Sequence, residues 1–192
     1  MKKPIYIIEH LEPELFEWCL IEYEHISQFL GGSENLWFTN VKNEVDIKKL
    51  ESFGKVFAES VKNMKLEKAC VLDPEAEKTL EPGKDFDYYI FGGILGDFPP
   101  KKRTKVELTR FIPDIPTRNI GKEQMSTDNA VYTVVQIAEN GKKLSELKFQ
   151  DKVSIEINEF ESVELPYRYN LVNGKPFMSS KIKEYLVKKS GF

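Results

Sequence analysis

Short apolar runs alternate with amphipathic stretches along most of this chain, and this alternation constrains the fold more than any other feature. The runs that read as strands cover residues 4–9, 35–41, 69–72, 87–91 and 118–120. The amphipathic stretches predict helices over 14–30, over 46 to about 63, and from Thr127 or Asp128 to near Gly141. Strands that alternate with helices favour an α/β domain with a largely parallel sheet.

The C-terminal region follows a different pattern. Residues 153–157 alternate like a strand, 163–169 read as extended, and 172–175 (VNGK) as a turn. A final short helix is expected to start at Ser179 or Ser180.

Composition favours a single cytoplasmic domain. The chain has 192 residues, and the 41% that are hydrophobic suffice for a sizeable core. No apolar run approaches the length of a membrane span, and the N-terminal apolar run is too short for a signal peptide. The net charge of −3 counts modestly against a dedicated nucleic-acid binder and modestly for a basic partner. The basic runs at 101–105 and 181–189 keep RNA open as a partner.

The cysteines and histidines do not indicate a metal centre. Cys19 and Cys70 are far apart, and no cluster of cysteine and histidine has the spacing of metal ligands. We expect two buried thiols in a reducing compartment and no bound metal.

A glycine-rich loop at 91–105 (FGGILGDFPPKKRTK) is the strongest candidate for a binding site. Gly92, Gly93 and Gly96 have no Cβ atoms, so the backbone can approach a ligand closely or adopt a positive φ. The spacing is not that of the dinucleotide fingerprint, and no Gly-Lys-Ser/Thr closes a P-loop. Taken alone, the loop fits a ligand site about as well as a sharp structural turn.

Polar residues and glycines follow several of the expected strands. Glu9 and His10 stand at the end of the first strand, Asp73 follows the third, and 92–97 and 121–127 follow later ones. Because parallel strands direct their carboxyl ends to one sheet edge, these segments should converge there. The pattern predicts a small-molecule site without defining its chemistry.

Five motifs in order carry a resemblance to a known family. They are YIIEH, VLDP, FGGILGDFPPKKRTKVEL, NIGKEQMSTDNAV and ELPYRY, and they extend from Tyr6 to about Tyr169. Together they closely resemble the SPOUT-class (α/β-knot) protein-arginine methyltransferase family, whose archaeal members are labelled predicted RNA methyltransferases. The resemblance implies a parallel sheet with helices on both faces and a C-terminal trefoil knot that binds S-adenosylmethionine (SAM). It implies one domain over 1–192, with an N-terminal α/β part at 1–80 and a knotted, cofactor-binding part with a C-terminal extension at 81–192.

The resemblance also assigns cofactor-binding residues to three loops. These are Leu72, Asp73, Gly92, Gly93, Ile94, Leu95, Gly96, Ile120, Gly121, Gln124, Met125 and Thr127. Apolar walls with backbone donors and acceptors suit the adenine and methionine parts of SAM.

Glu9 and Asp97 are the candidate catalytic residues. A carboxylate binds a guanidinium bidentately and can accept its proton during methyl transfer. The alternatives are a solvated strand end for Glu9 and a turn-stabilising side chain for Asp97.

Further candidates for contact with the substrate are His10, Arg103, Glu164 and Tyr167. His10 has a structural alternative, as a hydrogen-bonded residue. Arg103 is as well explained by a solvated basic run, and Glu164 and Tyr167 by strand packing.

We therefore expect a SAM-dependent methyltransferase that acts on an arginine of a ribosomal or other translation protein, as the resemblance implies. A base-methylating RNA methyltransferase and a non-catalytic SAM-binding, ribosome-associated module are the alternatives. The chain has no arginine before Arg103, which disfavours methylation of the ribose, because ribose-methylating SPOUT enzymes carry an essential N-terminal arginine. A monomer and a knot-mediated homodimer both remain open.

Overall fold

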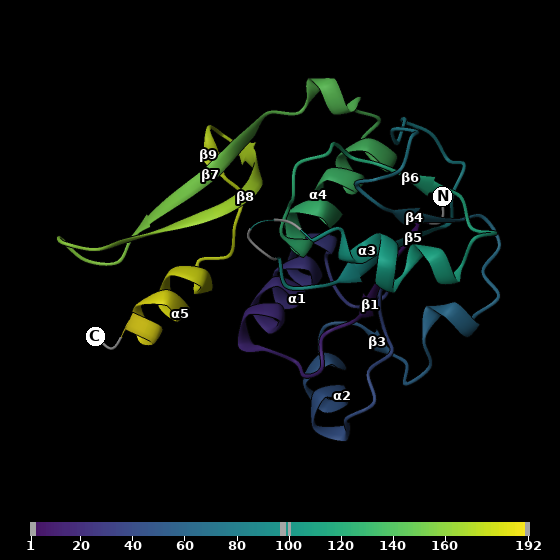
Figure 1. Ribbon diagram of the computed structural model, residues 1–192, viewed down its shortest axis with the longest axis horizontal. Helices are drawn as coiled ribbons and strands as arrows, with labels where there is room; N and C mark the ends of the chain where they lie inside the picture. The colour runs from purple at the N-terminus through teal and green to yellow at the C-terminus, as the bar shows by residue number, and fades with distance from the viewer. Residues whose placement is uncertain (1–2, 97–98, 100, 191–192) are drawn as a thin grey trace.

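A six-stranded sheet forms the centre of the computed structural model, which describes residues 3–96, 99 and 101–190 (Figure 1). All pairs of neighbouring strands are parallel, and the order is β3-β2-β1-β5-β4-β6. The strands are β1 (Ile5–His10), β2 (Leu36–Thr39), β3 (Lys55–Val56), β4 (Ala69–Leu72), β5 (Tyr88–Gly93) and β6 (Thr117–Arg118). The predicted parallel α/β sheet is confirmed.

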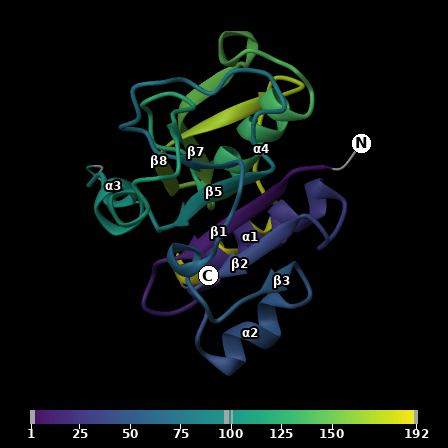
Figure 2. The same cartoon turned by 90° about the vertical axis from the view of Figure 1, so that its right-hand side faces the viewer.

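Helices and helical turns cover both faces of this sheet, as expected (Figure 2). The elements are α1 (Glu17–Leu30), α2 (Glu44–Leu50), α3 (Arg103–Glu107), α4 (Thr127–Ala138) and α5 (Lys181–Ser190), with 3-10 turns η1 (Val61–Asn63), η2 (Thr109–Phe111) and η3 (Leu144–Glu146). Side chains of β1 alternate between two cores. Tyr6 and Ile8 pack with α1 and α4, whereas Ile5 and Ile7 pack with η1 and the residues around η2.

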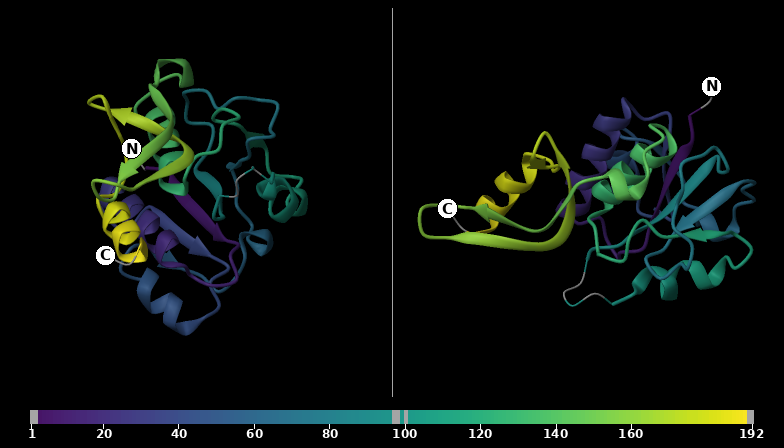
Figure 3. Two further views of the ribbon diagram at one scale, coloured as in Figure 1. Left: turned by 60° about the vertical axis from the view of Figure 1, so that its left-hand side comes forward. Right: turned by 90° about the horizontal axis from the view of Figure 1, so that it is seen from above.

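An antiparallel hairpin extends from the body of the molecule (Figure 3). It consists of β7 (Phe149–Glu156) and β8 (Ser162–Val172), and the short β9 (Lys175–Pro176) pairs with β8. One face of the hairpin packs against Ile21 of α1 and Ile182 of α5, through Val153, Ile155 and Leu165. The hairpin is therefore joined to the domain by an apolar contact of its own.

The structure differs from the predicted helix over 46–63. Helix α2 ends at Leu50, and the chain then turns to form β3 beside β2 and continues into η1. Gly54 permits this close approach to β2, because a Cβ at this position would lie 2.5 Å from the backbone oxygen of Leu36. The helix also begins before residue 46, since Asn43 accepts the capping hydrogen bond from the N–H of Val45 at 2.8 Å.

The basic run at 101–105 also contains an unexpected element. It begins helix α3, in which Arg103 forms an i,i+4 ion pair with Glu107. The C-terminal knot implied by the family resemblance stays a prediction.

Both cysteine thiols are buried and free, as expected. Burial raises the pKa of Cys70 to about 12, so this thiol stays protonated at neutral pH. No helix within the described residues has the length and apolar character needed to cross a membrane.

Replacing Gly54 with alanine should lower the free energy of unfolding by about 1–3 kcal/mol, because the added methyl group meets backbone atoms that cannot move aside cheaply. Urea denaturation of parent and variant measures the change. Gly83→Ala is the matched control, since its Cβ would make an ordinary 3.6 Å contact with the Asp85 side chain. Equal stability of the two variants would contradict our account of β3.

Candidate active site

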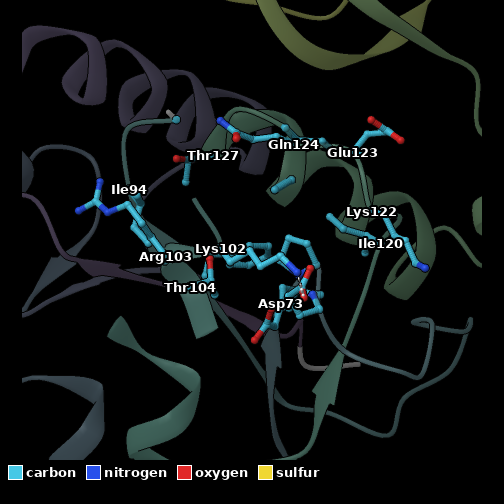
Figure 4. Close-up of a pocket in the computed structure, with 18 of the residues that line it drawn as sticks. Asp73, Ile94, Lys102, Arg103, Thr104, Ile120, Lys122, Glu123, Gln124 and Thr127 are labelled. Carbon is cyan, nitrogen blue, oxygen red and sulfur yellow. Dashed lines mark hydrogen bonds and ion pairs between the residues drawn. The ribbon is translucent and has the colours of Figure 1, made fainter. Parts of the chain in front are cut away.

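A cavity of about 320 Å³ lies at the carboxyl ends of β4, β5 and β6 (Figure 4). Its walls come from the loops that follow these three strands and from the first residues of α3 and α4. A cavity of this size falls at the lower end of the range for small-molecule sites. The predicted convergence is thus present for the loops after β4, β5 and β6, whereas Glu9 and His10 of β1 do not line the cavity.

The predicted cofactor-binding residues surround this cavity with one exception. Leu72, Asp73, Gly92, Ile94, Leu95, Gly96, Ile120, Gly121, Gln124, Met125 and Thr127 all line it. Gly93 does not. It packs against α1 and β1, where an added Cβ would lie 2.5 Å from the Tyr23 hydroxyl and 3.0 Å from the Glu9 carbonyl oxygen. The cofactor roles of these residues stay predictions.

The glycines of the loop are needed for space rather than for unusual dihedral angles. Gly92, Gly93 and Gly96 do not have positive φ values, which corrects one of the two expectations for them. At Gly96, the side chains of Gln124 and Tyr167 occupy the space that a Cβ would need. A positive φ of 102° occurs instead at Gly121, in the loop after β6.

Asp73 joins one wall of the cavity to a neighbouring turn. Its carboxylate accepts hydrogen bonds from the N–H of Glu75 at 2.9 Å and from the hydroxyl of Thr109 at 2.7 Å. It is almost fully buried. These contacts join the loop after β4 to η2, so the carboxylate of Asp73 is already occupied within the protein.

Gln124 carries a polar atom that lacks a partner within the protein. Its Nε2 atom is buried and makes no hydrogen bond in the described structure, although the residue lines the cavity. The backbone is held firmly, because the N–H of Arg168 donates to the Gln124 carbonyl at 2.8 Å. A buried amide without a partner costs free energy. Gln124 is therefore suited to bind a polar atom of a ligand.

The position of Glu9 corrects our first catalytic assignment. The residue lies near the carboxyl end of β1 as expected, but its side chain is wholly buried on the face that also carries Ile5 and Ile7. Its carboxylate accepts hydrogen bonds from Thr39 at 2.6 Å, from the N–H of Val61 at 2.9 Å, and from Ser60. Because these donors satisfy Glu9 and it does not line the cavity, we assign it a structural role. Asp97, the second catalytic candidate, lies outside the described residues.

His10 does not line the cavity. Its ring is buried, with Nδ1 3.4 Å from the Tyr23 hydroxyl, and burial lowers its pKa. Glu164 is also distant from the cavity. It is exposed on the hairpin and forms an ion pair with Lys152 at 3.3 Å. These positions favour the structural alternatives for both residues.

Tyr167 reaches the glycine loop without lining the cavity. Its hydroxyl donates to the carbonyl oxygen of Gly96 at 3.0 Å. This contact joins β8 to the loop after β5, and the backbone pairing of Met125 with Arg168 supports it from the neighbouring loop. The C-terminal hairpin thus contributes to the shape of the cavity.

Arg103 lines the cavity, but its guanidinium is engaged with carboxylates. It donates to Glu12 at 2.7 Å and to Glu107 at 2.7 and 3.2 Å. In Figure 4 its charged end points away from the middle of the cavity. These contacts make it a link between α3 and the loop after β1, and they leave little of its hydrogen-bonding capacity for a ligand.

Sequence reasoning missed Glu12, whose side chain binds the backbone of the glycine loop. The same oxygen of Glu12 accepts hydrogen bonds from the N–H of Leu95 at 2.9 Å and from Arg103 at 2.7 Å. The side chain is 8% exposed. The only signal in the sequence was an acidic residue shortly after a strand end, and nothing indicated a partner 83 positions away.

A buried carboxylate pair supports the start of α4. Glu22 accepts hydrogen bonds from the Trp18 indole at 2.6 Å and from the N–H of Thr127 at 3.0 Å. Asp128 lies nearby and contacts the His25 ring at 2.7 Å. Burial raises the pKa of Glu22 to about 8, and the charge of Asp128 adds to this shift.

The described residues contain no group of three or more histidine, cysteine or acidic side chains that could hold a metal ion. Metal-free activity stays a prediction.

Replacing Glu12 with glutamine should weaken SAM binding by roughly 10- to 100-fold, because a hydrogen bond to a charged group contributes about 1.5–3 kcal/mol. The weakened contact would release Leu95 and Arg103, which both line the cavity. Calorimetric titration measures the affinity. Glu14→Gln, an exposed change two residues away, is the control and should behave like the parent. Unchanged affinity in Glu12→Gln would show that this contact does not shape the cavity.

Replacing Glu22 with glutamine should flatten the pH dependence of stability. The pKa of Glu22 rises from 4.5 to about 8 on folding, so the folded state holds a proton that the unfolded state has lost. The parent should therefore lose stability as the pH rises from about 5 to 8, by at most about 1.4 kcal/mol per pH unit. Glutamine resembles the protonated acid and should remove this trend. Melting temperatures of both proteins at several pH values test it, and parallel curves would refute it.

Three comparisons with known proteins agree with this geometry. A family model described as "Protein arginine N-methyltransferase SFM1-like" matches residues 5–191. Protein arginine N-methyltransferase SFM1 of Saccharomyces cerevisiae is 36% identical over 203 residues, which cover 96% of this chain and 95% of the yeast protein.

Solved structures extend this similarity to the fold. The crystal structure of the yeast arginine methyltransferase SFM1 complexed with SAM has a TM-score of 0.90 and 33% identity, and the match covers 100% of this chain and 93% of that one. Trm10 from Thermococcus kodakaraensis, at 17% identity and a TM-score of 0.58 over 74% of this chain and 96% of its own, shares the fold alone. The chain belongs to the SFM1-like family of protein arginine N-methyltransferases.

Proposed function

We propose that this protein transfers a methyl group from SAM to an arginine side chain of another protein. Family membership along nearly the whole chain carries this proposal. The cavity supports it, because it lies at the sheet edge where the family resemblance places the cofactor. The cavity alone would accommodate other small molecules of similar size.

The residues around the cavity fit the parts of SAM. Leu72, Ile94 and Ile120 supply apolar walls for the adenine, and the unpartnered Nε2 atom of Gln124 can bind one of its acceptor atoms. Lys122 also lines the cavity, and in Figure 4 its ammonium points away from the middle. When bound, SAM supplies an electrophilic methyl group on its sulfonium.

An arginine acceptor requires a carboxylate that the described residues of the cavity do not offer freely. Asp73 is bound within the protein, and Glu75 pairs with Lys102 at 2.7 Å. The carboxylate of Glu123 points away from the middle of the cavity in Figure 4. Asp97 follows directly after Gly96 and remains our candidate for binding the guanidinium and accepting its proton.

We further propose that the enzyme acts in the cytoplasm on a ribosomal protein. This part of the proposal rests on the resemblance described for the sequence and on a net charge of −3, which favours a basic partner.

Incubation with labelled SAM tests the substrate class. Ribosomal proteins freed of RNA should become labelled, amino-acid analysis should recover the label as methylarginine, and purified ribosomal RNA should stay unlabelled. Label in RNA alone would replace this proposal with the RNA methyltransferase alternative. No label in either fraction, with SAM binding retained, would favour a non-catalytic module.

Asp97→Asn should slow methyl transfer by about 100- to 10,000-fold if Asp97 is the base, with SAM affinity within a few-fold of the parent. Asp85→Asn, an exposed change outside the cavity, is the matched control. Glu9→Gln should instead lower the stability of the fold, because Glu9 binds three donors in the core. Full activity of Asp97→Asn would remove Asp97 from the mechanism.

A further inference from the structure

An exposed aromatic ring contacts two cations beside the candidate active site. Phe111 of η2 is 51% exposed. The ammonium of Lys62 lies 4.4 Å from its ring centroid, and the guanidinium of Arg110 lies 4.6 Å from it. Lys105 and Val106, the latter 48% exposed, lie on α3 just before η2. We call these five residues the Phe111 surface.

Among the described residues, carboxylates do not compensate the cations of the Phe111 surface. A contact with an aromatic ring positions a cation without neutralising it. Within the described part of the chain, Lys62, Lys105 and Arg110 form no ion pair with a carboxylate. Their neighbours differ, since Lys102 pairs with Glu75 and Arg103 with Glu12 and Glu107. Lys102 and Arg103 of the basic run are thus paired with carboxylates, whereas Lys105 of the same run belongs to the unpaired cations of the Phe111 surface.

The second basic run of the chain does not have this character. On α5, Lys181 pairs with Glu24 at 2.7 Å and Lys188 with Glu17 at 3.6 Å. Lys189 contacts the ring of Tyr185, which is only partly exposed. Positive charge beside an exposed aromatic ring is therefore more concentrated at the Phe111 surface than on α5.

The Phe111 surface adjoins the cavity through α3. Arg103 and Thr104 at the start of this helix line the cavity, whereas Lys105 and Val106 are exposed to solvent. Figure 1 shows α3 in front of the sheet, close to β4 and β5. A partner bound to the Phe111 surface would lie next to a substrate that enters the cavity.

We infer that the Phe111 surface binds RNA, namely the RNA component of a ribonucleoprotein whose protein arginine enters the cavity. Unpaired lysine and arginine attract phosphates without regard to sequence. An exposed aromatic ring adds a surface on which a base or ribose can pack. An acidic protein segment would use the cations but gain less from the flat ring. The inference rests on the proposed ribosomal substrate.

Fluorescence anisotropy with a labelled single-stranded RNA of about 20 nucleotides and mixed sequence tests the surface, over salt concentrations of about 50 to 200 mM. The parent should bind with a dissociation constant of about 1–100 µM near physiological salt. The double variant Lys62→Gln with Arg110→Gln should bind RNA more weakly. Its affinity should also depend less steeply on salt, because the negative slope of log affinity against log salt becomes shallower by about 0.7 for each phosphate that is no longer neutralised. Phe111→Ala should weaken binding by about 5- to 100-fold and leave that slope nearly unchanged.

The matched control removes the same charge from α5, through Lys183→Gln with Lys188→Gln, and should bind RNA like the parent. Retained SAM affinity in every variant shows that the fold is intact. Equal weakening by the α5 control, or no RNA binding by the parent at low salt, would overturn the inference. It would also be overturned if polyglutamate displaced the RNA at lower concentration than unlabelled RNA does, because the occupant would then be an acidic protein.

Methyl transfer separates this inference from the proposed function. The variants of the Phe111 surface should label RNA-free ribosomal proteins at the parental rate and intact ribosomes more slowly. Equal labelling of intact ribosomes by parent and variants would contradict the docking role and leave the proposed function standing. Absence of methylarginine with the parent enzyme would contradict the proposed function, and the anisotropy measurements would still decide whether RNA binds.

Discussion

Strand β5 is hydrogen bonded to β1 on one side and to β4 on the other, and this central position decides where the cavity forms. Its last residues, Gly92 and Gly93, lie level with Glu9 and His10 of β1. The chain leaves β5 at the same edge as it leaves β4 and β6, so three loops meet around one space. Parallel pairing makes this convergence unavoidable, because every strand ends on the same side. The site depends on that pairing more than on any single side chain.

Carboxylates near this edge serve mainly to hold the loops in place. Glu9 and Asp73 accept hydrogen bonds from residues of other segments, and Glu12 binds the backbone of the glycine loop. Burial of a charge is costly unless donors satisfy it, and each of these carboxylates has at least two. The contacts join elements that are far apart in the chain, so the cavity has walls that are fixed relative to one another. Such preorganisation is what methyl transfer requires, since much of its catalysis can come from orientation.

The segment from 101 to 111 directs some of its residues toward the sheet and others toward solvent. Toward the sheet, Arg103 joins α3 to the loop after β1, and Leu108 enters the core. Toward solvent, the Phe111 surface remains positively charged and partly apolar. A net charge of −3 conceals this local concentration, because overall charge says nothing about the arrangement of charges. The protein substrate and the RNA that we propose would therefore bind adjoining parts of one small domain.

The sequence by itself determined most of the strands, the main helices and the loops that would meet, because periodicity and glycine positions act within a few residues of the chain. It also indicated the family, through motifs that lie mostly in those loops. Only the tertiary structure decided that 46–63 is not one helix, since the contact of Gly54 with Leu36 depends on strand pairing. The same holds for the carboxylates. Alternation along β1 places Glu9 on the face of Ile5 and Ile7, but nothing local says which face adjoins the cavity. The bonds from Leu95 to Glu12 and from Tyr167 to Gly96 join residues that only the packed chain brings together.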